Sequence, residues 1–479
     1  MKRYIVKLMM AAFVAVLTMG VSAQGLHSAY FLEGSVYRHQ MNPAFMGERN
    51  YVSIPVLGNM NIGVQGNVGM STFLYKTSAG SKYDLTTFMS PTVSAGDFLD
   101  GLHDKNKMNV NINMTILSFG FHKWGGFNTF DLNLRSNTSA NLPYDLFHFM
   151  KSNMSESAAS YNIKDLTVRS NNYVELALGH SRMIDDKLTV GGKLKFLLGG
   201  ANANAYIREM NLTLNDNQWD VTLDGQLDAS MKGASFTRKA EPVNGKYEID
   251  DFDIDSPGLG GFGIGIDLGA VYKMDEFVDG LTLSASVLDL GFIKWNHTIS
   301  ASNGGLQSFS FKGFEDIVVD DDDDRNSLDN QWDRISDDLE DLYRFYDDGV
   351  KTSRTTALAA TLNVGAEYAL PYYKKLTFGF LSTTRFNKPF TSTEGRFYAN
   401  IAPIKWFDAS VNYGASTYGS SFGWILNFHP KGFNFFIGSD HMIFKVNPQF
   451  VPIHNLNANV NFGFNITFGK SKKEIYVKN

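Results

Sequence analysis

The 479-residue chain has no cysteine, few prolines (12) and, beyond its first residues, no long apolar run. Without cysteine, an exported chain of this length cannot rely on disulfides, and it cannot carry a lipid anchor on a cysteine. No later window approaches about 18 consecutive apolar residues, so we expect no helix to span a membrane. The formal net charge of −6 argues against a nucleic-acid partner.

The N-terminus has the three parts of a secretory signal peptide. Lys2 and Arg3 precede an apolar run over residues 9–19, and Val21-Ser22-Ala23 follows as a small-x-small cleavage site. The alternative, a transmembrane helix, is poor because the apolar run is too short. We therefore expect residues 1–23 to be a signal peptide and the chain to be exported.

Glycine (44), phenylalanine (38) and tyrosine (21) are abundant, and residues 455–469 indicate how they are used. Every second residue from Leu456 to Phe468 is apolar, and asparagine, glycine or threonine stands between them. The side chains of a strand alternate between two faces, so one face of this segment is apolar and the other consists largely of amides.

The same alternation recurs along the chain and predicts about 14–16 strands. Short turns are expected at 122–126, 184–187, 215–218, 274–279, 371–375, 404–406 and 429–432. Longer segments, at 71–106, 139–165, 232–258, 296–352 and 444–453, each fall between two short turns. The expected fold class is therefore all-β: a transmembrane, antiparallel, up-and-down β-barrel over residues 51–469, with the long segments as extracellular loops.

Charged residues test this assignment, because a lipid-facing charge is costly. Most charges within the strands lie opposite the apolar series and are expected to face the lumen. They are Asp131, Arg135, Glu175, Lys193, Lys195, Asp267, Glu367, Arg385, Arg396 and Asp408. A soluble β-sandwich, the alternative, would have about half as many strands per domain. The prediction is a barrel in the outer membrane, with lipid outside and water inside.

Two stretches have helical spacing of apolar residues, 142–151 and 328–346. Both fall in long segments and are expected to pack on the outer mouth. Tryptophans 124, 219, 295 and 406 lie at strand ends or turns and are expected to form an interfacial girdle.

No motif predicts catalysis, a metal or a cofactor. Residues 258–263 fit GxGxxG, but a strand rather than a helix follows them, so the glycines are assigned to the strand. The five aspartates 320–324 lack the spacing of a calcium loop and are interpreted as a solvated acidic loop, with weak divalent binding as the alternative. Ser416 lies in a sequence that misses GxSxG.

Several short sequence segments resemble those of a known family. Asn42-Pro43-Ala44, between the signal peptide and the first strand, resembles the plug segment of FadL-type outer-membrane barrels. Leu117–Phe121, Asp267–Gly269, Asp289–Trp295 and the closing Phe462–Gly469 are similar to a Bacteroidetes family of uncharacterised FadL-related barrels akin to PorV. The resemblance implies that residues 24–50 form a plug in the lumen, with Asn42, Pro43 and Ala44 part of it. Residues 470–479 extend past the aromatic residue on which many barrels end.

The resemblance to FadL implies passive uptake of a hydrophobic or amphipathic small molecule. The resemblance to PorV implies a second hypothesis, a scaffold or shuttle that binds secreted proteins through its loops, with 296–352 as the largest surface. A lipid hydrolase with a Ser/His pair on the outer wall is a remote third hypothesis. Outer-membrane lipid is the expected environment, and we expect a monomer.

Overall fold

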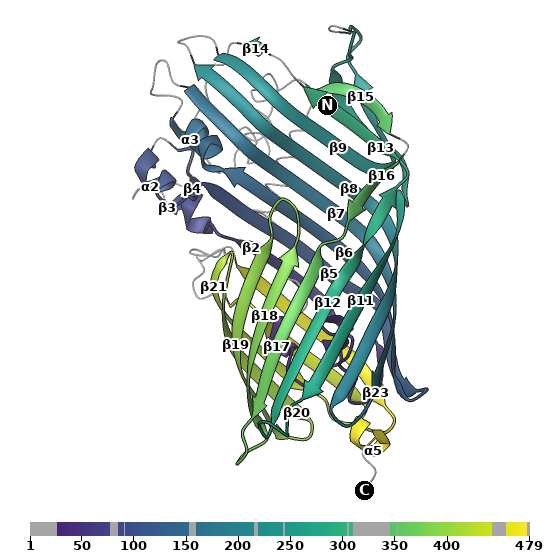
Figure 1. Cartoon of the computed structure of the whole chain (residues 1–479). Coiled ribbons are helices and arrows are strands. Elements are labelled where there is room, and N and C mark those ends of the chain that lie inside the picture. The colour runs from purple at the N-terminus through teal and green to yellow at the C-terminus, as the bar shows by residue number, and fades with distance from the viewer. Residues whose placement is uncertain are drawn as a thin grey trace.

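One antiparallel sheet of 21 strands makes the body of the computed structural model (Figure 1). The structure describes residues 26–76, 85–90, 92–152, 160–214, 219–242, 245–303, 306–309, 345–351, 353–442 and 457–476. The predicted signal peptide, the acidic run 320–324 and most of the predicted helix 328–346 lie outside these ranges.

Fourteen spans of the sheet close into a barrel, within the predicted range, and the first span is divided into β1 and β2. These two strands pair with both the last strand, β23, and with β5, which closes the wall. The barrel strands are β1 (Asn50–Ser53), β2 (Met60–Gly66), β5 (Lys105–Lys123), β6 (Gly126–Pro143), β7 (Ser160–Met183), β8 (Leu188–Leu214), β11 (Gly261–Lys273), β12 (Leu281–Trp295), β17 (Ala360–Ala369), β18 (Leu376–Phe386), β19 (Ser392–Ile404), β20 (Phe407–Ser416), β21 (Gly419–Phe428), β22 (Phe433–Ser439) and β23 (Ala458–Phe468).

Six predicted short turns connect barrel strands at one end of the barrel, which we call the turn end. They are 122–126, 184–187, 274–279, 371–375, 404–406 and 429–432. The seventh, 215–218, lies outside the described residues, and its flanking residues Leu214 and Trp219 are paired at the opposite end, the loop end. Two connections that the sequence analysis did not single out, 387–391 and 417–418, are short although they lie at the loop end.

The wall is therefore uneven in height, as Figure 1 shows. β7 has 24 residues and β8 has 27, whereas β17, β20 and β21 have 10 each. Parts of the expected loops 232–258 and 296–352 are strands that continue the tall side. They belong to β9 (Trp219–Arg238), β10 (Ile249–Gly258), β13 (Thr298–Asn303), β14 (Leu306–Phe309) and β15 (Tyr346–Lys351), while β16 (Arg354–Ala357) pairs with β12. Alternation misses β10 and β13–β15 because beyond the membrane both faces can be polar, as in the acidic β10.

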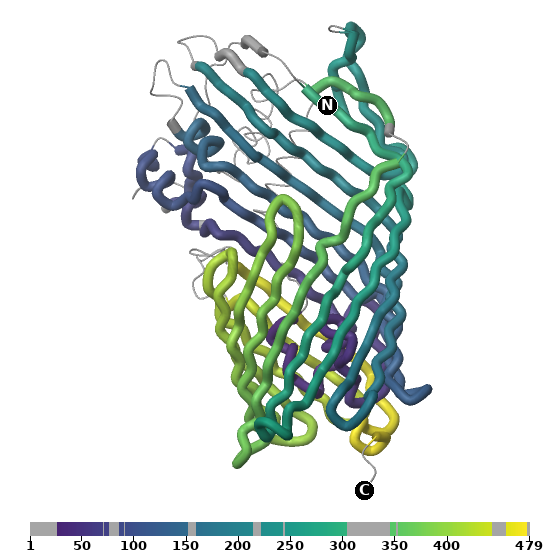
Figure 2. Tube along the Cα trace, viewed as in Figure 1, coloured from purple at the N-terminus to yellow at the C-terminus, as the bar shows by residue number. Residues whose placement is uncertain are grey.

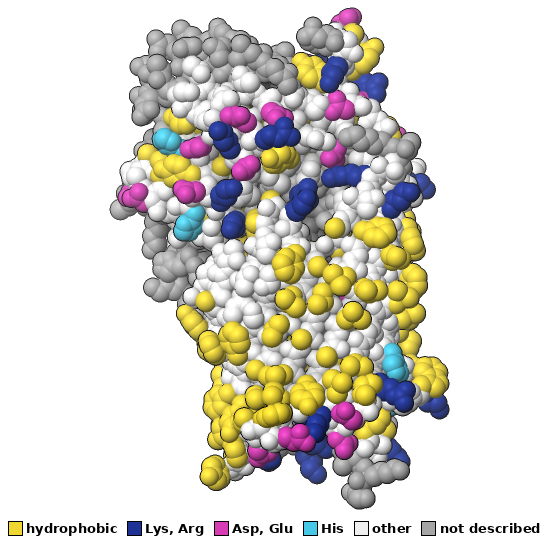
Figure 3. All heavy atoms as spheres, in the orientation of Figure 1, with side chains coloured by type: hydrophobic (Ala, Val, Ile, Leu, Met, Phe, Trp, Pro, Cys, Tyr) yellow, Lys and Arg dark blue, Asp and Glu magenta, His cyan; other side chains and the backbone are white. Residues whose placement is uncertain are grey.

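The outer surface of the barrel carries the apolar belt that the alternation predicts. Figure 3 shows apolar side chains over the lower barrel, with charged groups above and below them. Ile264, Ile266, Phe378 and Phe397 are among the exposed members. No helix in the described part of the chain is long and apolar enough to cross a membrane.

At the loop end the same outward face of β5–β8 is covered by protein. The covering lobe comprises η3 (Met70–Thr72), β3 (Leu74–Lys76), β4 (Leu85–Thr87), α2 (Ala95–Leu99) and α3 (Tyr144–Ser152). Phe88 and Phe98 stack with ring centroids 4.2 Å apart, and their cluster packs on Met108 and Leu142. The lobe buries apolar surface that lies beyond the lipid. It includes the predicted helix 142–151, which starts at Tyr144 because β6 continues to Pro143.

The chain from Leu26 to Gly47 lies inside the turn-end half of the barrel, where Figure 2 shows it enclosed by the strands. It contains two short 3-10 helices, η1 (His27–Ala29) and η2 (Arg38–Gln40). Tyr30, Phe31, Tyr37 and Phe45 form an apolar cluster with inward side chains of the wall. The C-terminal extension forms α5 (Lys472–Tyr476) at the turn end, where the Tyr476 ring packs on His122.

Candidate functional site: the lumen and its N-terminal segment

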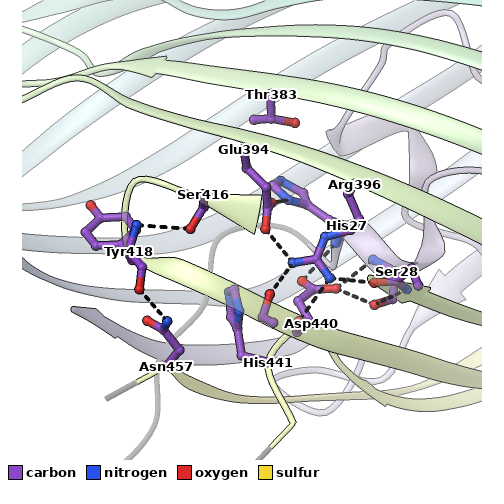
Figure 4. Close-up of polar contacts among 12 residues, drawn as sticks. His27, Ser28, Thr383, Glu394, Arg396, Ser416, Tyr418, Asp440, His441 and Asn457 are labelled. Carbon is purple, nitrogen blue, oxygen red and sulfur yellow. Dashed lines mark hydrogen bonds and ion pairs between the residues drawn. The ribbon is translucent and has the colours of Figure 1, made fainter. Parts of the chain in front are cut away.

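The N-terminal segment, residues 26–47, is hydrogen-bonded to the inner wall at many points, and at three of them several contacts converge. The first is Asp440, which follows β22 and is buried. Its carboxylate accepts hydrogen bonds from the backbone N–H groups of His27 (3.0 Å) and Ser28 (2.6 Å) and from the Ser28 hydroxyl (2.5 Å) (Figure 4). Hydrogen bonds to a charged group contribute about 1.5–3 kcal/mol each, so Asp440 is a strong anchor for the start of the segment.

An ion pair supports this anchor from β19. Arg396 binds Glu394, and its second terminal nitrogen donates to the backbone carbonyl of Asp440 at 3.0 Å. The Glu394 carboxylate also lies 3.0 Å from Nδ1 of His27. Figure 4 shows these groups converging from β19, β22 and the segment. Without the segment, the Asp440 carboxylate would lose three hydrogen-bond donors: the N–H groups of His27 and Ser28 and the Ser28 hydroxyl.

The second attachment is a closed ring of hydrogen bonds through His39. Lysine is a donor without acceptor capacity, so Lys193 Nζ donates to His39 Nδ1 at 2.7 Å and His39 Nε2 carries the proton. Nε2 then donates to the Tyr51 hydroxyl, which donates to Ser118, which donates to Asp131, each step at 2.8 Å. Asp131 accepts from Lys193 at 2.9 Å and closes the ring. The ring joins the segment to β1, β5, β6 and β8.

The third attachment is the Asn-Pro-Ala motif. The Asn42 amide donates to the backbone carbonyls of Ala270 (3.3 Å) and Ala285 (3.2 Å), and its oxygen accepts from the N–H of Ala44 (2.9 Å). Two wall glycines make room for the motif. A β-carbon on Gly191 would lie 2.2 Å from the Pro43 carbonyl oxygen, and one on Gly269 would lie 2.0 Å from Asn42 Oδ1. No side chain larger than hydrogen fits at either position while the motif is seated.

The charged residues expected in the lumen lie on the inner wall in contact with partners. Asp131, Glu175, Lys193, Lys195, Asp267, Arg396 and Asp408 are buried, and Arg135, Glu367 and Arg385 are partly exposed. Asp408 accepts from the Gly34 N–H (3.1 Å) and Asn427 (2.7 Å), and Glu367 accepts from Thr377 (2.7 Å). These contacts replace much of the water that the sequence analysis expected around these charges.

Lys195 is the centre of the largest charge cluster. Its ammonium lies 2.5 Å from Asp289, 2.9 Å from Asp267 and 3.4 Å from Glu175. Arg135 approaches Glu175 to 3.0 Å. Buried charges need such partners because their transfer from water is costly.

The lumen is also crossed at the loop end, where the hairpin β18–β19 reaches the opposite wall. Asn387, in its turn, donates to Asn137 (3.3 Å) and Ser139 (3.0 Å) of β6. Arg385 donates to Asn111 of β5 at 3.2 Å, and the Lys107 ammonium lies 5.4 Å from the centre of the Phe390 ring. We call these contacts the crossing contact. Sequence alone gave no signal for them, because they join residues about 250–280 positions apart.

The other sequence expectations have mixed outcomes. Trp124 and Trp406 are exposed near the turn end, and the side chain of Trp219 is outside the described set. Trp295 was wrongly assigned to a girdle, since it is fully buried and its Nε1 donates to Thr356 at 2.8 Å. The Ser416 hydroxyl donates to the Gly419 carbonyl at 3.0 Å. In the described ranges no serine hydroxyl is hydrogen-bonded to a histidine ring, and no group of three or more metal-ligating side chains occurs.

A closed antiparallel barrel with an apolar outer belt and a polar inner wall defines the class of this protein, an outer-membrane β-barrel. Within that class, the chain belongs to DUF5723, a family of unknown function whose model matches residues 43–440. No curated protein matches the sequence.

Solved outer-membrane barrels are similar to this chain at low identity. The toluene transporter TbuX of Ralstonia pickettii aligns with a TM-score of 0.41 at 10% identity, over 90% of this chain and 94% of that one. A FadL homologue of Pseudomonas aeruginosa aligns with a TM-score of 0.37 at 9% identity, over 94% of this chain and 99% of that one.

Proposed function

We propose that this protein is a closed outer-membrane transport barrel for a hydrophobic or amphipathic small molecule, and that residues 26–47 are its plug. The observation that carries the proposal is the seat of the segment. Gly191 and Gly269 accommodate Asn42 and Pro43, and Asp440 holds His27 and Ser28. At these points the space inside the wall is filled by a separate segment and not by side chains of the wall itself. This arrangement supports a closure that can be removed.

Two further features support a gated conduit. The segment would close the turn end, which we assign to the periplasm, and the crossing contact would close the loop end. Both closures depend on hydrogen bonds and ion pairs between separate parts of the chain. Such contacts can be exchanged for contacts with a ligand at a small net free-energy cost.

Because the chain has no cysteine, the plug can be tested with an engineered disulfide. A β-carbon on Gly423 would lie 2.8 Å from Ser28 Oγ, so the double variant Ser28→Cys, Gly423→Cys brings the two side chains close enough for a disulfide. The same β-carbon would lie 2.4 Å from Asn412 Oδ1 and 2.8 Å from an Arg396 nitrogen, so these two side chains must shift, and the single Gly423→Cys variant controls for that shift. The readout is uptake by whole cells of N-phenyl-1-naphthylamine, a fluorescent apolar dye that lipopolysaccharide excludes. We expect uptake in the reduced state and its loss on oxidation.

The single variants Ser28→Cys and Gly423→Cys are the controls, because oxidation cannot cross-link them within one chain. Uptake that is equal in the oxidised and reduced double variant would contradict the plug. Uptake no greater than in cells without the protein, in every state, would contradict transport itself.

The tall side of the wall favours a second candidate, a barrel that binds a secreted or surface protein. β9, β10 and β13–β15 build a sheet beyond the apolar belt, and it carries ion pairs whose basic partner is exposed, such as Arg238–Asp347 and Lys246–Asp348. Native mass spectrometry of gently purified barrel tests this candidate. It predicts one stoichiometric protein partner that is lost when residues 239–248 are replaced by a short glycine-serine turn.

A further inference from the structure

Arg385 lies near the loop-end terminus of β18, on the inner wall above the N-terminal segment. Its hydrogen bond is to a neutral group, Asn111 Oδ1 on β5, at 3.2 Å. Its Nε is buried and has no hydrogen-bond partner among the described residues. A guanidinium carries five donors, so most of the donors of Arg385 have no hydrogen-bond partner among the described residues.

Other arginines of the inner wall contrast with Arg385. Arg135 lies 3.0 Å from Glu175, Arg354 lies 3.5 Å from Asp228, and Arg396 pairs with Glu394. Across the described residues, no carboxylate comes within ion-pair distance of Arg385. A cation at a confined site without a counter-charge is unfavourable unless an anion can come to it.

Two further donors lie close to the partner of Arg385 on the inner wall, because Asn111 is two residues from Asn113, the direct cross-strand neighbour of Arg135. One belongs to Arg135, whose Nε is buried and unpaired among the described residues. The other is the Tyr173 hydroxyl, since Tyr173 on β7 is the direct cross-strand neighbour of Arg135. Asp289, the nearby carboxylate, is already bound to Lys195 at 2.5 Å. Three donors from β6, β7 and β18 therefore share one region of the lumen, and the Nε atoms of Arg135 and Arg385 have no acceptor among the described residues.

We propose that Arg385, Arg135 and Tyr173 form a binding site for an anionic group of carboxylate or phosphate size. The several oxygens of such a group can accept from all three donors, and charge-assisted bonds to guanidinium are the strongest of this type. The site rests on the proposed function, to which it adds a substrate class: amphipathic molecules with an anionic head. The group would arrive either on such a molecule or as a free inorganic anion.

The test uses the full-length barrel in lipid nanodiscs and calorimetric titration with octanoate, octanamide and inorganic phosphate. Octanoate and octanamide share a tail and differ in charge. We expect octanoate to bind at least about tenfold more tightly than octanamide, because a charge-assisted bond exceeds a neutral one. Arg385→Gln should abolish the difference, and Arg385→Lys should retain part of it.

Arg182→Gln is the matched control, because Arg182 is exposed near the turn end of β7. It should leave the tenfold difference intact. Gel mobility before and after heating checks that each variant is folded. If Arg385→Gln does not fold, the intermediate affinity expected of Arg385→Lys serves as the test.

Each outcome of these titrations either supports or overturns the anion site. Equal affinities for octanoate and octanamide, with no binding of phosphate, would overturn the site. So would a difference that Arg385→Gln leaves unchanged. Phosphate binding that depends on Arg385, without discrimination between the octyl probes, would support the site and assign it to free anions. Binding at Arg385 together with dye uptake that the Ser28–Gly423 disulfide does not affect would retain the site and reject the plug.

Discussion

The side chain of Asn42 occupies the space that a β-carbon on Gly269 would need, with Oδ1 2.0 Å from that position. Neither residue is strained by this contact. The contact makes the wall and the segment complementary in shape at this point. A methyl group added at Gly269 is enough to test this complementarity.

We therefore expect Gly269→Ala to displace the Asn-Pro-Ala motif while the barrel remains closed. The added methyl group would overlap Asn42, and overpacking of this kind typically costs about 1–3 kcal/mol. Amide hydrogen exchange of residues 40–46 is the measurement, and exchange should become faster there. Gly265→Ala, on the same face of β11, is the control, because its nearest neighbour is the end of the Leu358 side chain at 3.3 Å. Equal exchange in the two variants would contradict the assigned seat.

Asp440→Ala should release the start of the segment. It removes the acceptor of two backbone N–H groups and one hydroxyl, each worth about 1.5–3 kcal/mol. Limited proteolysis from the periplasmic side should then cleave near residues 26–32, which are protected in the parent. Asp279→Ala in an exposed turn removes a carboxylate without touching the segment, and it should leave the protection unchanged.

The apolar belt predicts that an introduced arginine lowers the stability strongly at a lipid-facing position and little in a turn. Ile266 and Val278 are similarly exposed, at 42% and 45%, but Ile266 lies within β11 and Val278 lies in a turn. Ile266→Arg should reduce the free energy of unfolding in lipid vesicles by about 2–4 kcal/mol. Val278→Arg should change it little. A similar loss of stability in both would mean that β11 does not face the hydrocarbon core.

Lys195 balances three carboxylates, and Lys195→Ala would leave Glu175, Asp267 and Asp289 without their shared cation. Removing one partner of a buried ion pair typically costs about 3–5 kcal/mol. The double variant Lys195→Ala, Asp289→Asn removes one negative charge and should recover part of the loss. Urea denaturation in lipid vesicles measures both effects. A double variant no more stable than the single one would show that charge balance is not the cause.

Much of the fold could be predicted because lipid imposes a strict rule on one face of each strand. Phe464 and Asn465 are neighbours in sequence, yet Phe464 is exposed on the outer face and Asn465 is fully buried inside. Alternation of this kind located the barrel strands and six turns. It could not assign β10, whose sequence Ile249–Gly258 is acidic and lies beyond the membrane, where neither face must be apolar.

The contacts of the site were less predictable for a different reason. The sequence drew attention to Asn42, Pro43 and Ala44 through a resemblance, but nothing local to His39 indicates that it would meet Lys193 and Asp131. Trp295 shows the same limit, since its place at a strand end suggested an interface although it is buried against Leu197 and Ile293. Pairings across a lumen depend on register and closure, which single segments do not encode.

The seat of the N-terminal segment also constrains the order of assembly. His27 and Ser28 are among the first residues the structure describes, yet they bind Asp440 and contact Asn412 and Glu394, more than 360 positions later in the chain. Those partners come from the last strands to be synthesised. The start of the segment therefore cannot be held before the wall is nearly complete, so this part would be fixed in place last, after the barrel has formed around it.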